Sequence, residues 1–138
     1  MPEVMRLMAA RLRQFVGNRR SARRFEARLG CTVKLAGANG ARHAVALTGH
    51  TRDASASGLG LLMPAIHIEG HYLTGAGTTL LVELELPGAT IRMQAVAVRY
   101  ERVEQPEEKI CYLVGVRITE MSEEDHERFA AYVRDLKR

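Results

Sequence analysis

The chain has 138 residues, of which 46% are hydrophobic and 26% are charged, as in one ordinary globular domain. This balance excludes a disordered or collagen-like protein, and the apolar runs are shorter than the roughly 20 residues that a membrane span needs. The N-terminus lacks the compact apolar core of a secretory signal. We therefore expect a soluble cytoplasmic protein with no membrane span.

The net charge of +4 is distributed unevenly along the chain. Residues 1–28 hold eight arginines and two glutamates and carry +6, whereas the rest of the chain carries −2. The basic segment contains no lysine, which favours the planar, bidentate contacts that guanidinium groups make with phosphates and bases. The charge distribution therefore favours an anionic partner.

The start of the chain has the periodicity of an amphipathic helix. Apolar residues recur at steps of three and four within residues 2–16: Met5, Met8, Leu12 and Phe15. Gly17 and Asn18 then provide a stop signal and a hinge. Because so short a helix is marginal alone, we expect it to pack on the barrel, a second copy or a protein partner. We divide the chain into this helix and hinge, residues 1–18, and a domain of residues 19–138.

From Phe25 the apolar period changes to two, which predicts β-strands. Turn residues separate six such runs, at about 25–35, 43–52, 59–63, 80–86, 90–102 and 110–118. Residues 65–79 are rich in glycine and are expected to form a surface loop. Ser122 is the predicted N-cap of a terminal helix. This pattern predicts a mainly β fold, a six-stranded antiparallel barrel that the terminal helix plugs or flanks.

Two polar segments stand out from this framework. Arg19–Arg24 precedes the first predicted strand, and Asp53–Gly58 lies between the second and third. A guanidinium can clamp a phosphate, pair with the O6/N7 edge of guanine or stack on its ring. The carboxylate of Asp53 can accept from the N1 and N2 donors of guanine, with the Ser55 hydroxyl beside it. The two segments together predict a pocket for an anionic guanine nucleotide.

These segments resemble the signature of PilZ domains, which is RxxxR in a linker followed by (D/N)xSxxG on a barrel. The matches are RSARR at residues 20–24 and DASASG at residues 53–58. Arg19 and Arg23 match the first motif in a second register. Each motif alone is weakly specific, whereas both in this strand context are strong. The resemblance covers about Arg19–Leu136.

The resemblance implies a non-catalytic receptor of the bacterial second messenger cyclic di-GMP, with no other cofactor and no metal. It implies ligand contacts for six residues: Arg19, Arg20, Arg24, Asp53, Ser55 and Gly58. In similar domains, an arginine just before RxxxR accompanies the binding of two stacked ligand molecules, and Arg19 holds that position. Ligand binding is expected to change the conformation of the domain or the docking of a partner.

The same residues favour other functions less. The pI near 9.4 suits a barrel that binds RNA or single-stranded DNA, but an aromatic content of 5% without tryptophan offers no stacking platform. A PilZ-like scaffold that has lost nucleotide binding is disfavoured by the intact motifs. His67 and His71 suggest a metal pair only on a helix, which Pro64 and Gly70 disfavour. Ser55 has no neighbouring base in sequence, so nucleophilic catalysis is not expected.

Overall fold

The structure is a computed structural model that describes residues 23–36, 45–75, 77–104 and 110–136. Its elements are β1 (Phe25–Glu26), β2 (Gly30–Leu35), β3 (Leu47–Ala54), β4 (Gly58–Met63), β5 (His67–Ile68), β6 (His71–Tyr72), β7 (Leu80–Leu86), β8 (Ala89–Glu104), β9 (Ile110–Met121) and α2 (Glu123–Leu136). The predicted helix and hinge at 1–18, together with Arg19 and Arg20, lie outside the described residues. No helix in the described part of the chain is long and apolar enough to cross a membrane.

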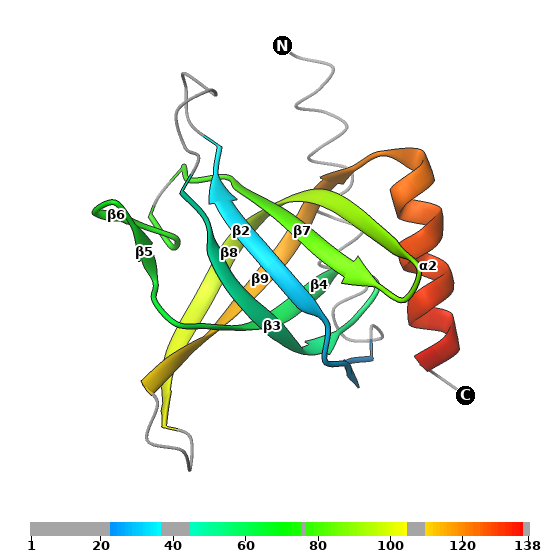
Figure 1. The fold of residues 1–138 in the computed structure, drawn as a ribbon, viewed down its shortest axis with the longest axis horizontal. Coiled ribbons are helices and arrows are strands. Elements are labelled where there is room, and N and C mark those ends of the chain that lie inside the picture. Colours follow the sequence, from blue (N-terminus) through cyan, green and yellow to red (C-terminus); the bar gives the residue numbers. More distant parts are fainter. Residues whose placement is uncertain (1–22, 37–44, 76, 105–109, 137–138) are drawn as a thin grey trace.

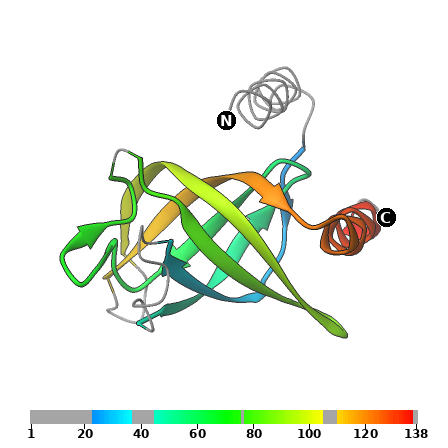
Figure 2. The same ribbon diagram turned by 90° about the horizontal axis from the view of Figure 1, so that it is seen from above.

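Six strands form a closed antiparallel barrel, as predicted. Hydrogen-bonded neighbours follow the order β3-β2-β7-β8-β9-β4, and β4 pairs again with β3. This last pairing closes the ring, so its strands present no open edge to other chains. The short β1 pairs with the end of β3 beside the ring. Figures 1 and 2 show the barrel from two directions, with α2 at one end and the β5–β6 hairpin at the other.

Alternate side chains along the strands fill the barrel, as the period of two requires. The buried positions of β2, β7 and the first half of β8 are Cys31, Val33, Leu35, Leu80, Val82, Leu84, Leu86, Ile91, Met93 and Ala95. Phe129 and Val133 of α2 join this core. The predicted cap is confirmed, because Ser122 Oγ accepts the Asp125 N–H at 3.1 Å. The helix therefore flanks one end of the barrel and buries its apolar face there.

The expectation of a surface loop at residues 65–79 was wrong. The segment contains the β5–β6 hairpin, whose turn residues Glu69 and Gly70 both have positive φ, at 49° and 83°. Two consecutive positive φ values are typical of the tight turns that connect antiparallel strands. Ile68 of β5 and the flanking residues Ile66 and Leu73 are buried in the core. The strands are too short for their alternation to be recognised in sequence, although the hairpin and its flanking residues contribute three apolar side chains to the core.

The first predicted strand, at 25–35, is divided into β1 and β2. The predicted alternation of buried and more exposed residues along it is nevertheless observed. Between β1 and β2, the buried hydroxyl of Thr51 donates to the carbonyl oxygen of Ala27 and accepts the N–H of Leu29. The Thr51 N–H donates in turn to the Leu29 carbonyl oxygen at 2.8 Å. The Thr51 side chain thus takes the place of backbone hydrogen bonds between the strands at this point. It provides partners for backbone groups of Ala27 and Leu29 that would otherwise be buried without any.

Candidate functional site

The DASASG segment joins β3 to β4, and its first and last residues belong to those strands. Asp53 lies in β3 and Gly58 begins β4, so the turn proper is shorter than the segment between strands that the sequence suggested. Ser55 is buried, and its Oγ accepts the N–H groups of Ser57 at 3.4 Å and Gly58 at 3.2 Å. The Ser55 N–H donates to the Gly58 carbonyl oxygen at 2.9 Å. Ser55 therefore holds the turn together.

Gly58 is required by a close approach between β4 and β9. A Cβ at this position would lie 2.5 Å from the carbonyl oxygen of Val116, which belongs to the backbone of β9. Because backbone atoms cannot swing aside as a side chain can, any larger residue would push the two strands apart. Gly58 thus sets the position of the turn against the barrel wall.

A β-bulge places Asp53 on the outer face of the barrel. The register of β3 against β4 shifts between Thr51, which is opposite Leu61, and Asp53, which is opposite Gly60. Leu61 is a core residue. Gly60 lies between the core residues Leu59 and Leu61 in the strand, so it is on the outer face. The extra residue in the bulge therefore reverses the parity of the strand and brings Asp53 to the outside.

Two arginines hold the Asp53 carboxylate. Arg24 Nη1 donates to Asp53 Oδ1 at 2.8 Å, and Arg52 Nε donates to Asp53 Oδ2 at 3.2 Å. The side chain of Asp53 is 11% exposed, whereas those of Arg24 and Arg52 are about half exposed. Charge-assisted bonds of this kind fix the carboxylate in one orientation while the guanidinium groups keep further donors for another anion.

Two glycines continue from Asp53 across the outer face. Asp53 is opposite Gly60 of β4, Gly60 is opposite Gly115 of β9, and Gly115 is opposite Arg99 of β8. The acid and the arginine therefore stand at the two ends of a row whose middle has no side chains. A cleft of about 190 Å³ opens over this row, lined by Arg24, Arg52, Gly60, Arg99, Tyr100, Glu101, Leu113 and Gly115. A flat floor with cations at both sides suits a planar, anionic ligand.

The structure therefore brings together four of the six predicted site residues and adds others that the sequence did not indicate. Asp53, Ser55 and Gly58 come from the end of β3, the turn after it and the start of β4, and Arg24 reaches Asp53 from the residue before β1. Of the two possible registers of RxxxR, the one ending at Arg24 has the arginine that contacts Asp53. The missed residues are Arg52, Gly60, Arg99 and Gly115. The sequence feature that could have indicated the floor is the presence of single glycines, Gly60 and Gly115, inside apolar strands.

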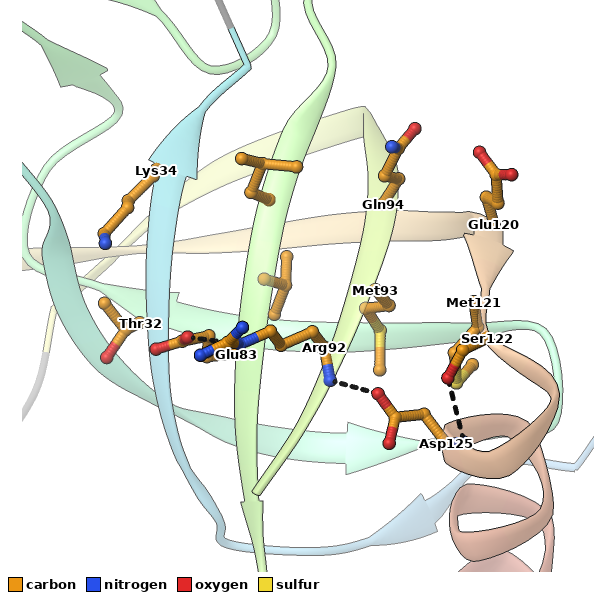
Figure 3. A pocket seen from close by; sticks show the side chains of 12 residues that line it. Thr32, Lys34, Glu83, Arg92, Met93, Gln94, Glu120, Met121, Ser122 and Asp125 are labelled. Carbon is orange, nitrogen blue, oxygen red and sulfur yellow. Dashed lines mark hydrogen bonds and ion pairs between the residues drawn. The ribbon is translucent and has the colours of Figure 1, made fainter. Parts of the chain in front are cut away.

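A larger cavity, of about 720 Å³, lies where β2, β7 and β8 meet the start of α2 (Figure 3). Arg92 of β8 connects the neighbouring elements of the cavity wall. Its Nε donates to Glu83 of β7 at 2.8 Å, and its backbone N–H donates to Asp125 of α2 at 3.0 Å. Arg24, Asp53, Ser55 and Gly58, the predicted site residues that the structure describes, do not line it. Its acidic side chains, which include Glu120, outnumber the two basic ones. Such a surface attracts a dianionic nucleotide less than the arginine-lined cleft does.

His67 and His71 lie on the two strands of the β5–β6 hairpin, not on a helix. Within the described ranges, no group of three or more histidine, cysteine, aspartate or glutamate side chains is arranged to hold a metal ion.

Similarity to a known protein family extends over nearly the whole chain. A family model described as "PilZ domain" matches residues 18–135. No curated protein matches the chain.

Three solved structures illustrate the likeness in fold. The PilZ domain with c-di-GMP of YcgR from Escherichia coli has a TM-score of 0.62 and 15% identity, over 87% of this chain and 92% of that one. The inhibitor of motility MotI/DgrA of Bacillus subtilis has a TM-score of 0.57 and 18% identity, over 87% of this chain and 52% of that one. MrkH of K. pneumonia in its apo state has a TM-score of 0.62 and 17% identity, over 83% of this chain and 49% of that one. This chain thus spans about half the length of the last two proteins.

Proposed function

The chain belongs to the PilZ domain family, and we propose that it is a non-catalytic receptor for cyclic di-GMP. The observation that carries the proposal is the Asp53 carboxylate, held by Arg24 and Arg52 at the edge of a glycine floor. A carboxylate in this position can accept from the N1 and N2 donors of guanine, while the arginines meet phosphate oxygens or the guanine ring.

The charge of the cleft supports an anionic ligand. Its lining includes Arg24, Arg52 and Arg99, and the acids in or beside it are Asp53 and Glu101. The site is therefore net cationic, because three guanidinium groups outnumber two carboxylates. Both phosphodiesters of cyclic di-GMP are negatively charged, so the ligand complements the arginines, and its guanines complement Asp53.

We assign the ligand contacts by role. Arg20 and Arg24 grip phosphate and guanine, with Arg19 beside them, and Asp53 accepts from the guanine edge. Ser55 and Gly58 shape the base-binding surface, because the hydrogen bonds of Ser55 and the close packing of Gly58 hold the turn next to Asp53. On this proposal no other cofactor and no metal takes part.

The consequence of binding follows from where the arginines stand in the chain. Residues 19–24 are the first residues of the proposed domain, 19–138, and directly follow the proposed helix and hinge at 1–18. We propose that closure of Arg20 and Arg24 on the ligand changes how this helix docks on the barrel, on a second copy or on a protein partner in the cytoplasm. A ligand shifts such an equilibrium only if it binds one arrangement better than the other.

Isothermal titration calorimetry tests the ligand. Cyclic di-GMP is expected to bind with clear preference over GTP, GMP, cyclic di-AMP and an unstructured oligonucleotide. Arg20→Ala and Arg24→Ala should each weaken binding by about 2 kcal/mol or more, because each removes a charge-assisted contact. Arg92→Ala, in the other cavity, is the matched control and should bind as the parent does. No heat with cyclic di-GMP at high micromolar concentration, or stronger binding of the oligonucleotide, would overturn the proposal.

Deletion of residues 1–16 tests the consequence. The truncated protein should still bind cyclic di-GMP but lose a ligand-dependent change in oligomeric state or in proteolysis at Gly17. If the intact chain shows no such change with ligand, the helix has no switching role.

A further inference from the structure

We infer that Arg99 is a further ligand-binding residue of this cleft. It lies across the floor formed by Gly60 and Gly115 from Asp53, and it determines affinity from the β8 side. This inference rests on the proposed function, since it assigns a further residue to the same site. It concerns a residue far in sequence from both the RxxxR and the DASASG segments.

The distance across the floor suits a ligand larger than one base. Asp53, Gly60, Gly115 and Arg99 are successive partners on four neighbouring strands. Adjacent strands are about 4.8 Å apart, so the backbone row from β3 to β8 spans about 14 Å. A guanine bound at Asp53 therefore leaves the β8 half of the cleft for another part of the same nucleotide ligand.

A second β-bulge brings Arg99 to this face. The register of β8 against β9 shifts between Ala97, which is opposite Val116, and Arg99, which is opposite Gly115. Val116 is a core residue, and Ala97 packs against the core. Regular alternation would have turned Arg99 inward with Ala97, so the additional residue, Val98, is what places the guanidinium outside. The bulges in β3 and β8 thus place Asp53 and Arg99 on the outer face, at the two ends of the same row.

The glycine beneath Arg99 lets its side chain lie along the floor. A Cβ at Gly115 would be 3.3 Å from Arg99 Cγ and 3.5 Å from Arg99 Nε. The arginine therefore packs over the backbone of β9, and a larger residue there would press against it. A side chain at Gly60 would likewise meet Asp53, at 2.7 Å from Oδ1. Each glycine makes room for the charged residue next to it.

Arg99 is also available for an incoming anion. The ion pairs among residues 23–36, 45–75, 77–104 and 110–136 involve Arg24, Arg52, Arg92 and Arg128, and none involves Arg99. Arg24 and Arg52 each share Asp53, whereas Arg99 stands at the opposite side of the cleft. A phosphodiester or the O6/N7 edge of a guanine is the chemistry that an unpaired guanidinium there would bind.

Calorimetry with cyclic di-GMP on four proteins tests the inference. Arg99→Ala should weaken binding about tenfold or more, whereas Arg92→Ala, on the same strand but in the other cavity, should stay close to the parent. Arg99→Lys separates the two contacts: partial recovery indicates phosphate, and no recovery indicates the bidentate base edge. Equal melting temperatures of the Arg99 and Arg92 variants establish that the fold is retained.

Gly115→Ala provides an independent test of the same contact. It should weaken binding in the parent background and have little further effect together with Arg99→Ala, because both changes act through one guanidinium. If the parent binds, Arg24→Ala loses binding and Arg99→Ala behaves like Arg92→Ala, the inference is overturned and the proposed function stands. If the parent itself does not bind, the proposed function fails first.

Discussion

The guanidinium of Arg24 donates to the carboxylate of Asp53 across 2.8 Å, so two residues separated by 29 positions in sequence are bonded in the protein. Arg52 holds the second carboxylate oxygen at 3.2 Å. Because the arginines are about half exposed, these pairs contribute little stability, on the order of 1 kcal/mol or less. Their effect is to orient Asp53 toward the cleft.

Asp53→Ala is expected to reduce the preference of the site for guanine. The change removes the acceptor for the N1 and N2 donors of the base, so the ratio of affinities for cyclic di-GMP and cyclic di-AMP should fall about tenfold or more. Competition calorimetry measures that ratio, with thermal unfolding as the check that the barrel is intact. An unchanged ratio would mean that Asp53 does not contact the base.

Ser55→Ala should lower stability as well as binding. The hydroxyl accepts two backbone N–H groups within the turn, so its loss leaves buried donors without a partner and should cost about 1–2 kcal/mol. Ser57→Ala is the matched control in the same turn and should cost less than about 0.5 kcal/mol. Urea unfolding measures both, and equal midpoints for the two variants would contradict the bonding role of Ser55.

Gly58→Ala should destabilise the barrel by about 1–3 kcal/mol, because its new methyl group meets the rigid backbone of β9. Gly30→Ala is the control. There the new Cβ would meet only the carboxylate of Glu85, at 2.7 Å, and that exposed side chain can move away. The two free energies of unfolding, measured in urea, should therefore differ clearly. Similar values would show that β4 and β9 can separate without cost.

His50 should make stability depend on pH. Burial, and then the nearby charge of Arg28, lower the pKa of His50 from its usual 6.5, and Arg28 Nη1 donates to His50 Nε2 at 3.0 Å. The unfolded chain binds the proton more readily than the folded chain, so the contribution is complete above pH 6.5 and falls as pH drops toward the folded-state pKa. The effect is small, because the imidazole is only partly buried.

His50→Gln should accordingly lose less stability than the parent when the pH falls from about 7.5 to about 5.0, roughly the range in which histidine side chains in general change charge. Urea midpoints at the two pH values measure the difference, and His71→Gln, at an exposed position of β6, is the control. If the His50 and His71 variants lose stability equally, the contact with Arg28 does not govern the protonation of His50.

Arg19→Leu should change the stoichiometry of binding from two cyclic di-GMP molecules per chain toward one. The reason is that an arginine just before RxxxR accompanies paired ligands in similar domains, and its guanidinium can stack on a second guanine. Calorimetric titration at chain concentrations well above the dissociation constant gives the stoichiometry directly. A parent protein that saturates at a single ligand would remove the basis for this role.

The sequence by itself determined the barrel and its terminal helix. Both follow from local patterns, since alternation of apolar residues specifies which face of a strand is buried and Ser122 caps the helix that it precedes. The DASASG motif likewise located the turn that follows Asp53. The β5–β6 hairpin was missed because its strands, with two residues each, are too short for a period to be visible.

Only the tertiary structure decided which side chains share the cleft. Alternation read along β3 would place Asp53 on the same face as the buried Thr51, and alternation along β8 would place Arg99 on the same face as Ala97. The bulges reverse both assignments, and a bulge is a property of two paired strands, because it exists only where one of them has an extra residue opposite the other. The row from Asp53 through two glycines to Arg99 depends in the same way on the register of four strands, which no single segment of the chain encodes.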